Sequence, residues 1–182
     1  VLPEGEGRVQ VESRELIAVL KPDRYISDVT LITVEQLMEQ GKRLILLDRD
    51  NTIVPRDTKV IPDDTLQWIR DVQAAGIDVA LISNNWKRNV VTSDEELGTW
   101  SIAPALKPLP ISFLRAVRKA GVKRSEALVV GDQVFTDILG AKLAGIDVVL
   151  VLPQTEVDLQ HTLALRNLEA YVLRDMVPEG RE

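Results

Sequence analysis

The residues with the clearest chemical meaning are two aspartates, Asp48 and Asp50, which follow the apolar run Leu44–Leu47. Ionised carboxylates this close together repel each other, so a shared position calls for a compensating cation. The chain has one histidine and no cysteine, and carboxylate oxygens alone favour Mg²⁺ over softer metals. Beside such a cation one aspartate can attack phosphorus while the other carries a proton. The pair therefore indicates phosphoryl chemistry.

Further polar side chains stand where other apolar runs end or where a helix is about to begin: Ser83, Asn84, Lys107, Asp132 and Asp137. Each feature alone is weak, because Asp pairs and Ser-Asn-Asn turns are common in loops. Their joint appearance at successive strand ends is much harder to obtain by chance. Acids, a hydroxyl and one lysine at a single edge suit the binding of a metal ion and a phosphate group.

The elements that must position these residues are apolar runs without period-2 alternation, as expected for strands buried on both faces. The predicted strands are residues 44–48, 77–83, 127–132 and 146–152, with a short one at 99–103. Helices are predicted between them, over residues 62–76, 109–121 and 133–145. This alternation predicts an α/β protein with a three-layer, Rossmann-like fold and a mostly parallel sheet. In such sheets ligands bind at the carboxyl ends of the strands.

Outside this repeat, helices are predicted over residues 13–20, 33–41 and 158–176. Thr33 is the expected N-cap of the second, and Gly41 its end. The predicted helix at 62–76 has Asp63 or Asp64 as its expected N-cap. Residues 1–12 and 177–182 are expected to be flexible tails around one domain, residues 13–176.

Composition narrows the function class. The chain has 182 residues and a net charge of -6, which argues against nucleic-acid binding because no basic stripe is available for backbone phosphates. No apolar run approaches the roughly 20 residues that cross a bilayer, and the N-terminus has no signal-peptide pattern. We expect a cytoplasmic protein, or one peripheral to the inner face of a membrane. The absence of cysteine excludes disulfides and thiolate metal sites.

The segments "LLDRDNT", "LISNN", "LKP" and "VVGDQVFTD", in this order, resemble the four motifs of the haloacid dehalogenase (HAD) superfamily of phosphohydrolases. Within that superfamily the chain looks like the YqeG-type phosphatases of subclass IIIA, over roughly residues 14–153. The resemblance implies a Mg²⁺-dependent phosphatase that works through an aspartyl-phosphate intermediate.

By that resemblance, four acids take distinct roles. Asp48 matches the nucleophile and a metal ligand, and Asp50 matches the general acid and base, whose backbone carbonyl also faces Mg²⁺. Asp132 matches the metal-binding carboxylate of the last motif. Asp137 matches a supporting acid near the metal waters or the lysine.

The remaining matched residues surround the phosphate. Ser83 matches the hydroxyl that hydrogen-bonds the phosphoryl group, and Lys107 matches the cation that holds nucleophile and phosphoryl group together. Thr52 and Asn84 are expected at further positions around the phosphate. Mg²⁺ and Lys107 would then stabilise most of the negative charge of the transition state.

Members of the superfamily often insert a cap domain, and this chain has no room for one between Asp50 and Ser83 or between Ser83 and Lys107. An uncapped site needs its substrate, a partner or a surface to exclude water, which favours a large substrate. The YqeG-type proteins are similar to a mitochondrial phosphatase of phosphatidylglycerophosphate, so this lipid is the expected substrate. Residues 158–176 or 14–24 are the segments expected to contact a membrane.

Other functions stay open. Arg49 gives the motif "DRD", which histidinol-phosphate and heptose-bisphosphate phosphatases share, so a small soluble phosphate ester is the alternative substrate. Those enzymes typically continue "DRDG" and carry a Cys/His zinc loop, whereas this chain reads "DRDN" and has no cysteine. A receiver domain fits less well, because its phosphorylated aspartate lies at a later strand end than its acidic pair. A non-catalytic phosphate-binding scaffold is a further alternative.

Overall fold

The apolar runs of the sequence pair side by side as one sheet. The computed structural model describes residues 19–85, 97–155 and 160–180. Six strands, all parallel, lie in the order β1-β6-β5-β2-β3-β4. Their bounds are β1 Arg24–Ile26, β2 Leu44–Leu47, β3 Asp78–Ile82, β4 Trp100–Ile102, β5 Ala127–Gly131 and β6 Asp147–Val151. The predicted strands and the parallel sheet are confirmed.

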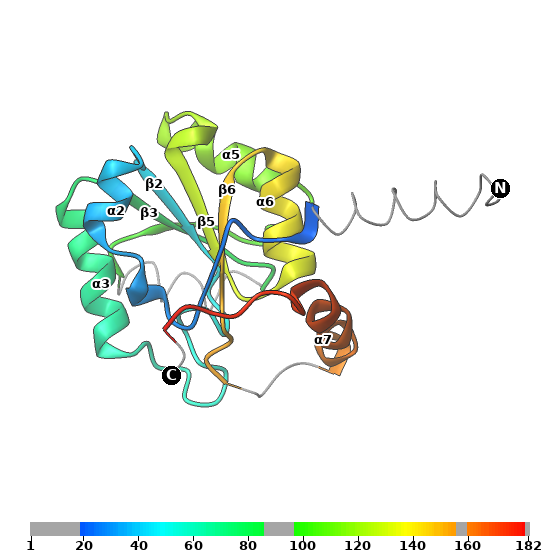
Figure 1. Cartoon of the computed structure of the whole chain (residues 1–182). Helices are drawn as coiled ribbons and strands as arrows, with labels where there is room; N and C mark the ends of the chain where they lie inside the picture. Colours follow the sequence, from blue (N-terminus) through cyan, green and yellow to red (C-terminus); the bar gives the residue numbers. More distant parts are fainter. Residues whose placement is uncertain (1–18, 86–96, 156–159, 181–182) are drawn as a thin grey trace.

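Helices cover both faces of this sheet, which gives the predicted three layers. Figure 1 shows α2 and α3 beside one face and α5 and α6 beside the other, with α7 next to α6. The α-helices are α2 Val34–Glu39, α3 Asp63–Ala74, α5 Ile111–Ala120, α6 Leu139–Ala144 and α7 Gln160–Leu173. Shorter helical turns are η1 Val29–Leu31, η2 Arg124–Glu126 and the π-helical η3 Val134–Ile138.

Burial on both faces explains why the central strands lack alternation. In β2, Ile45 and Leu47 belong to the apolar cluster under α2 and α3, whereas Leu44 and Leu46 belong to the cluster under α5 and α6. All four side chains are fully buried. A central strand that is buried on both faces is therefore apolar along its length, and β2 ends where the polar residue Asp48 follows.

Two short segments extend the sheet beyond what the sequence predicts. β1 pairs with β6 over only three residues, and its length gives no periodic signal. Glu179, within the predicted C-terminal tail, then pairs with β1: its backbone N–H donates to Tyr25 O at 3.0 Å and its carbonyl accepts from Ser27 N at 2.9 Å. Pairings of this kind, between residues far apart in the sequence, depend on tertiary placement rather than on the segment's own pattern.

Helix ends follow the predictions with one correction. Thr33 caps α2 in a capping box with Gln36, as predicted. The predicted N-cap at Asp63 or Asp64 is wrong, because α3 begins at Asp63 and Pro62 is its N-cap. Proline fixes φ near the helical value, so it can open the helix and leave both acids in the first turn, where the helix dipole favours them. Most of the predicted helix at 13–20 lies outside the described residues.

The described residues contain no cap domain. Between β2 and β3 lies a single helix, α3, and the described part between β3 and β5 holds only β4, α5 and η2. None of the described helices has the length and apolar character that a bilayer crossing requires. Among the described residues, no inserted domain covers the carboxyl edge of the sheet.

We predict that Phe113→Ala lowers the free energy of unfolding by about 3–5 kcal/mol, because the ring is buried between α5 and α6 and its loss leaves a cavity. The packing is close: a Cβ on Gly140 would lie 2.5 Å from Phe113 Cε2. Urea denaturation measures the loss. Leu109→Ala is the control, since Leu109 is 55% exposed and its truncation should change stability by less than about 0.5 kcal/mol. Equal losses in both variants would contradict this packing.

Candidate active site

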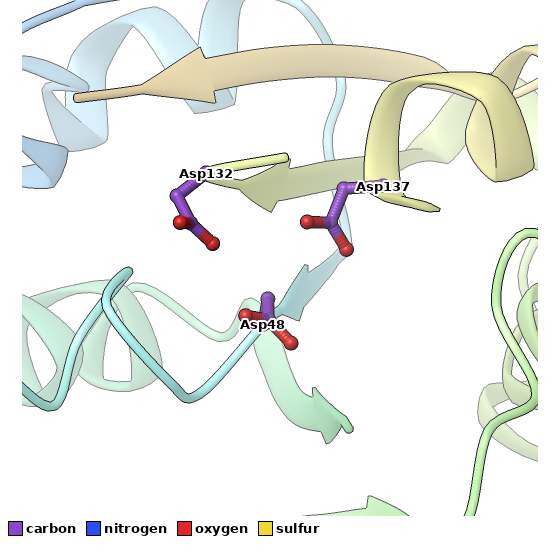
Figure 2. Close-up of side chains that lie close together, drawn as sticks. All are labelled: Asp48, Asp132 and Asp137. Carbon is purple, nitrogen blue, oxygen red and sulfur yellow. The ribbon is translucent and has the colours of Figure 1, made fainter. Parts of the chain in front are cut away.

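Three buried aspartates meet at the carboxyl edge of the sheet. Asp48 follows β2, Asp132 follows β5, and Asp137 comes from η3. β2 and β5 are neighbours in parallel register, so both strands end at the same place. One carboxylate oxygen from each residue lies within 4.8 Å of the others, and Figure 2 shows the three side chains gathered around a common space. Asp137, predicted only as a supporting acid, is thus a full member of the cluster.

Lys107 supplies the cation inside this cluster. Its side chain reaches the acids from the loop before α5 and is itself buried. The ammonium group donates to a carboxylate oxygen of Asp48, to Asp137 Oδ1 at 2.6 Å and to the carbonyl of Ile82 at 3.0 Å. The lysine therefore ties Asp48, which follows β2, to Asp137 of η3.

Burial dominates the electrostatics of the cluster. It raises the pKa of Asp48 well above the ordinary value; the charge of Lys107 acts in the opposite direction, and Asp137 and Asp132 add to the rise. For Lys107, burial acts to lower the pKa, but the charges and hydrogen bonds of Asp137 and Asp48 raise it overall. Three carboxylates against one ammonium group leave an excess of negative charge, which a divalent cation would neutralise.

Gly131 makes the approach of Asp137 possible. A Cβ built on this glycine would lie 2.3 Å from Asp137 Cγ, well inside van der Waals contact. Asp137 is further held by the backbone N–H of Gln133, which donates to its Oδ2 at 3.2 Å. The glycine of "VVGD" is therefore required by the space that the acid occupies.

Asp50 lies apart from the three clustered carboxylates. Arg49 Nη1 donates to its Oδ1 at 2.6 Å, and the Asn85 side-chain amide donates to its Oδ2. The backbone N–H of Asn85 also donates to Ser83 Oγ at 3.1 Å. The sequence reasoning missed Asn85, although it directly follows the predicted Ser83 and Asn84. That the Asp50 backbone carbonyl faces a metal stays a prediction.

Asn84 holds Lys107 in place. Its Oδ1 accepts from the Lys107 backbone N–H at 2.7 Å, and its Nδ2 donates to the Lys107 carbonyl at 3.1 Å. Thr52 Oγ1 donates to Asp132 Oδ1 at 3.4 Å, and Ser83 is buried beside the cluster's strand ends. The structure thus brings all the predicted site residues to one edge. The predicted contacts of Ser83, Asn84 and Thr52 with phosphate stay predictions.

Asn51 anchors the loop that carries Asp50 and Thr52, a role that the sequence did not reveal. It is fully buried in a left-handed conformation, with φ 64°. Its side chain donates to the Thr155 carbonyl at 3.3 Å and accepts from Thr155 Oγ1 at 3.0 Å. The loop after β2 is therefore fixed to the loop after β6. The only local signal was the tolerance of asparagine for positive φ.

Comparison with known proteins identifies the family of the chain. The family model of the haloacid dehalogenase-like hydrolases matches residues 5–145. The probable phosphatase YqeG of Bacillus subtilis is 34% identical over 159 residues, which cover 87% of this chain and 92% of the relative. Phosphoglycolate phosphatase 1 of Pseudomonas aeruginosa is 36% identical over 100 residues, but the match covers only 35% of that protein.

Solved structures support the fold. The deoxy-D-mannose-octulosonate 8-phosphate phosphatase YrbI of Haemophilus influenzae matches with a TM-score of 0.51 at 16% identity, over 74% of this chain and 89% of that one. An uncharacterized protein from Listeria monocytogenes matches with a TM-score of 0.51 at 19% identity, over 73% of this chain and 99% of that one. At such identities the likeness shows the fold alone.

We predict that Asp48→Asn stabilises the metal-free protein, and more so as pH rises. Because the folded-state pKa of Asp48 is raised, the folded state binds its proton more tightly than the unfolded state does. The wild type therefore loses stability as pH rises from the ordinary aspartate range through the raised pKa, and the neutral asparagine avoids this loss. Urea denaturation in a chelator, between about pH 4 and about pH 8, measures the difference. A difference that stays constant with pH would contradict the raised pKa.

Proposed function

We propose that this chain, which belongs to the haloacid dehalogenase-like hydrolases and is a phosphatase, cleaves phosphomonoesters through an aspartyl-phosphate on Asp48. The observation that carries the proposal is the buried contact of Lys107 with Asp48 and Asp137 inside the acidic cluster. A nucleophilic carboxylate, a fixed cation and further acids at one point are what phosphoryl transfer requires.

The residues fit Mg²⁺ as the metal. Asp48, Asp132 and Asp137 offer buried carboxylate oxygens within reach of one another, and no histidine or cysteine is among them. Magnesium prefers such oxygen ligands and keeps part of its water shell for a substrate phosphate. When bound, the ion supplies positive charge that offsets the repulsion between the negatively charged nucleophile and the phosphoryl oxygens.

The first half-reaction forms a bond between an Asp48 carboxylate oxygen and phosphorus, while the bond from phosphorus to the ester oxygen breaks. Asp50 donates its proton to that leaving oxygen. In the second half, Asp50 takes a proton from water as the water oxygen attacks phosphorus and the bond to Asp48 breaks. Asp48 is regenerated, and inorganic phosphate leaves.

The surrounding residues keep these groups in place. Arg49 and Asn85 hold the two oxygens of Asp50, and Asn84 holds the backbone of Lys107. We propose that the Ser83 hydroxyl hydrogen-bonds the phosphoryl group, since Ser83 is buried directly after β3, at the same edge of the sheet. Positioning of this kind is a large part of the rate in phosphoryl transfer.

As substrate we propose the lipid phosphatidylglycerophosphate, hydrolysed to phosphatidylglycerol and phosphate. The support is the lack of a cap among the described residues, because an open site needs a large substrate or a surface to exclude water. A lipid head group presented by a bilayer supplies both.

A small soluble ester is the second candidate. Sequence similarity to phosphoglycolate phosphatase 1 favours it, although the chain matches only about a third of that protein's length, 35%. Arg49 favours a small ester too, because the small-metabolite phosphatases also have an arginine between the two aspartates, in the motif "DRD".

We predict that Asp48→Asn abolishes Mg²⁺-dependent release of phosphate from p-nitrophenyl phosphate, with a loss of at least about 1,000-fold, because the nucleophile is removed. Phosphate release and trapping of a phosphorylated protein are the measurements. Asp63→Asn is the matched control: Asp63 is exposed in the first turn of α3, and this variant should keep full activity. Activity that survives in Asp48→Asn would remove Asp48 from the nucleophile role.

We predict that phosphatidylglycerophosphate in mixed micelles has a kcat/KM at least about tenfold above that of p-nitrophenyl phosphate, because binding the head group at the interface contributes to transition-state stabilisation. The same assay includes phosphoglycolate, histidinol phosphate and sugar phosphates. A soluble metabolite that exceeds the lipid by a wide margin would reject the lipid and leave the phosphatase mechanism intact.

A further inference from the structure

The outer side of α5 carries one exposed apolar residue followed by two exposed arginines. Ile111, Arg115 and Arg118 follow one another at helical spacing of four and three residues, so they lie on one face of the helix. All three are exposed, whereas Phe113, Ala116 and Val117 on the other side are buried in the core. Neither arginine forms an ion pair with another residue in the part of the chain described.

The charge around α5 is positive, whereas the net charge of the whole protein is negative. The net charge is -6, yet the segment from α5 to η2 holds one acid, Glu126, against five cations: Arg115, Arg118, Lys119, Lys123 and Arg124. Cations in the last turn of a helix stabilise its dipole, which accounts for Arg118 and Lys119. Arg115 in the middle of α5 and the two cations beyond its end have no such explanation.

The same helix begins next to the active site with exposed apolar side chains. Leu106, Leu109 and Ile111 are 55–60% exposed and flank Lys107, whose ammonium group lies in the acidic cluster. They are not needed to fill the core, which Phe113 and Val117 already do on the inner side of α5. Apolar surface thus borders the entrance of the site, and cationic surface continues from it along α5.

We propose that this α5 surface, made of Leu109, Ile111, Arg115 and Arg118, docks the protein on an anionic phospholipid bilayer. Apolar side chains at the site entrance would enter the interface while the arginines meet anionic head groups, which is the combination that holds peripheral proteins on membranes. The inference rests on the proposed lipid substrate and adds where the enzyme meets the membrane that contains it.

The two segments that the sequence suggested for this contact suit it less well. In α7, Glu169 and Val172 are buried, and Glu169 accepts from the Val134 backbone N–H at 2.8 Å, so this part of the helix packs on the protein. In the N-terminal segment, Lys21 pairs with Asp175 and Arg24 with Glu179. Their charges are already compensated within the protein.

The experiment compares sedimentation with vesicles of phosphatidylcholine alone and with added phosphatidylglycerol. The wild type should bind only the anionic vesicles, less so as salt rises. Each arginine near an anionic surface is expected to contribute about fivefold to the affinity for vesicles. Arg115→Gln should therefore weaken vesicle binding about fivefold, and the double variant Arg115→Gln with Arg118→Gln about 25-fold. The matched control is Arg70→Gln, because Arg70 is exposed on α3 at the opposite face of the sheet.

An apolar pair completes the test: Ile111→Gln should weaken vesicle binding, whereas Met38→Gln on α2, 60% exposed, should not. All variants should hydrolyse p-nitrophenyl phosphate at the wild-type rate. The docking surface is wrong if the α5 variants bind vesicles as well as the wild type does, or if the wild type binds equally well to vesicles of pure phosphatidylcholine. Either result rejects the surface even if the enzyme hydrolyses the lipid. Loss of vesicle binding in these variants, with no hydrolysis of lipid by the wild type, supports the surface and rejects the lipid substrate.

Discussion

The site depends on one buried ion cluster, in which Lys107 contacts both Asp48 and Asp137. Carboxylates removed from water are costly unless a cation and hydrogen bonds compensate them. Parallel pairing of β2 and β5 brings the acids to one edge, and Asn84 fixes the backbone of the lysine that joins them. The loops at this edge are held by separate contacts, such as those of Asn51 with Thr155 after β2 and of Asn84 with Lys107 after β3.

One lysine does not fully compensate the charge of three buried carboxylates, so the metal-free cluster lowers the stability of the fold. The uncompensated charge is what lets the site bind a metal ion for catalysis. The raised pKa of Asp48 expresses the free energy that burial costs its ionised form. A divalent cation that binds the ionised acids recovers this cost, so metal affinity and the strain of the metal-free site are linked. The same negative charge repels a phosphate ester, and a bound divalent cation would reduce that repulsion.

Much of this arrangement was predictable because burial on both faces leaves a clear signal. The central strands, their parallel orientation and the residues at their ends followed from continuous apolar runs, whereas the order of the strands did not. β1 was missed because three residues carry no periodicity, and its stability comes from β6. Asn85 and Asn51 were missed because their side chains bond to groups brought near by the fold, on Asp50 and Thr155. No local pattern encodes such partners.

The distribution of charge explains how an acidic protein can still meet an anionic substrate. Lys107 is committed to Asp48 and Asp137, so little of its charge is available to attract a phosphate from a distance. The net charge of -6 repels one as well. The cations of α5 lie outside the cluster: Arg115 lies one turn after the start of the helix near Lys107, and Arg118 lies in its last turn, farther from the site. Under the proposed docking on a bilayer, binding of the enzyme to the membrane surface would take the place of long-range attraction of single substrate molecules.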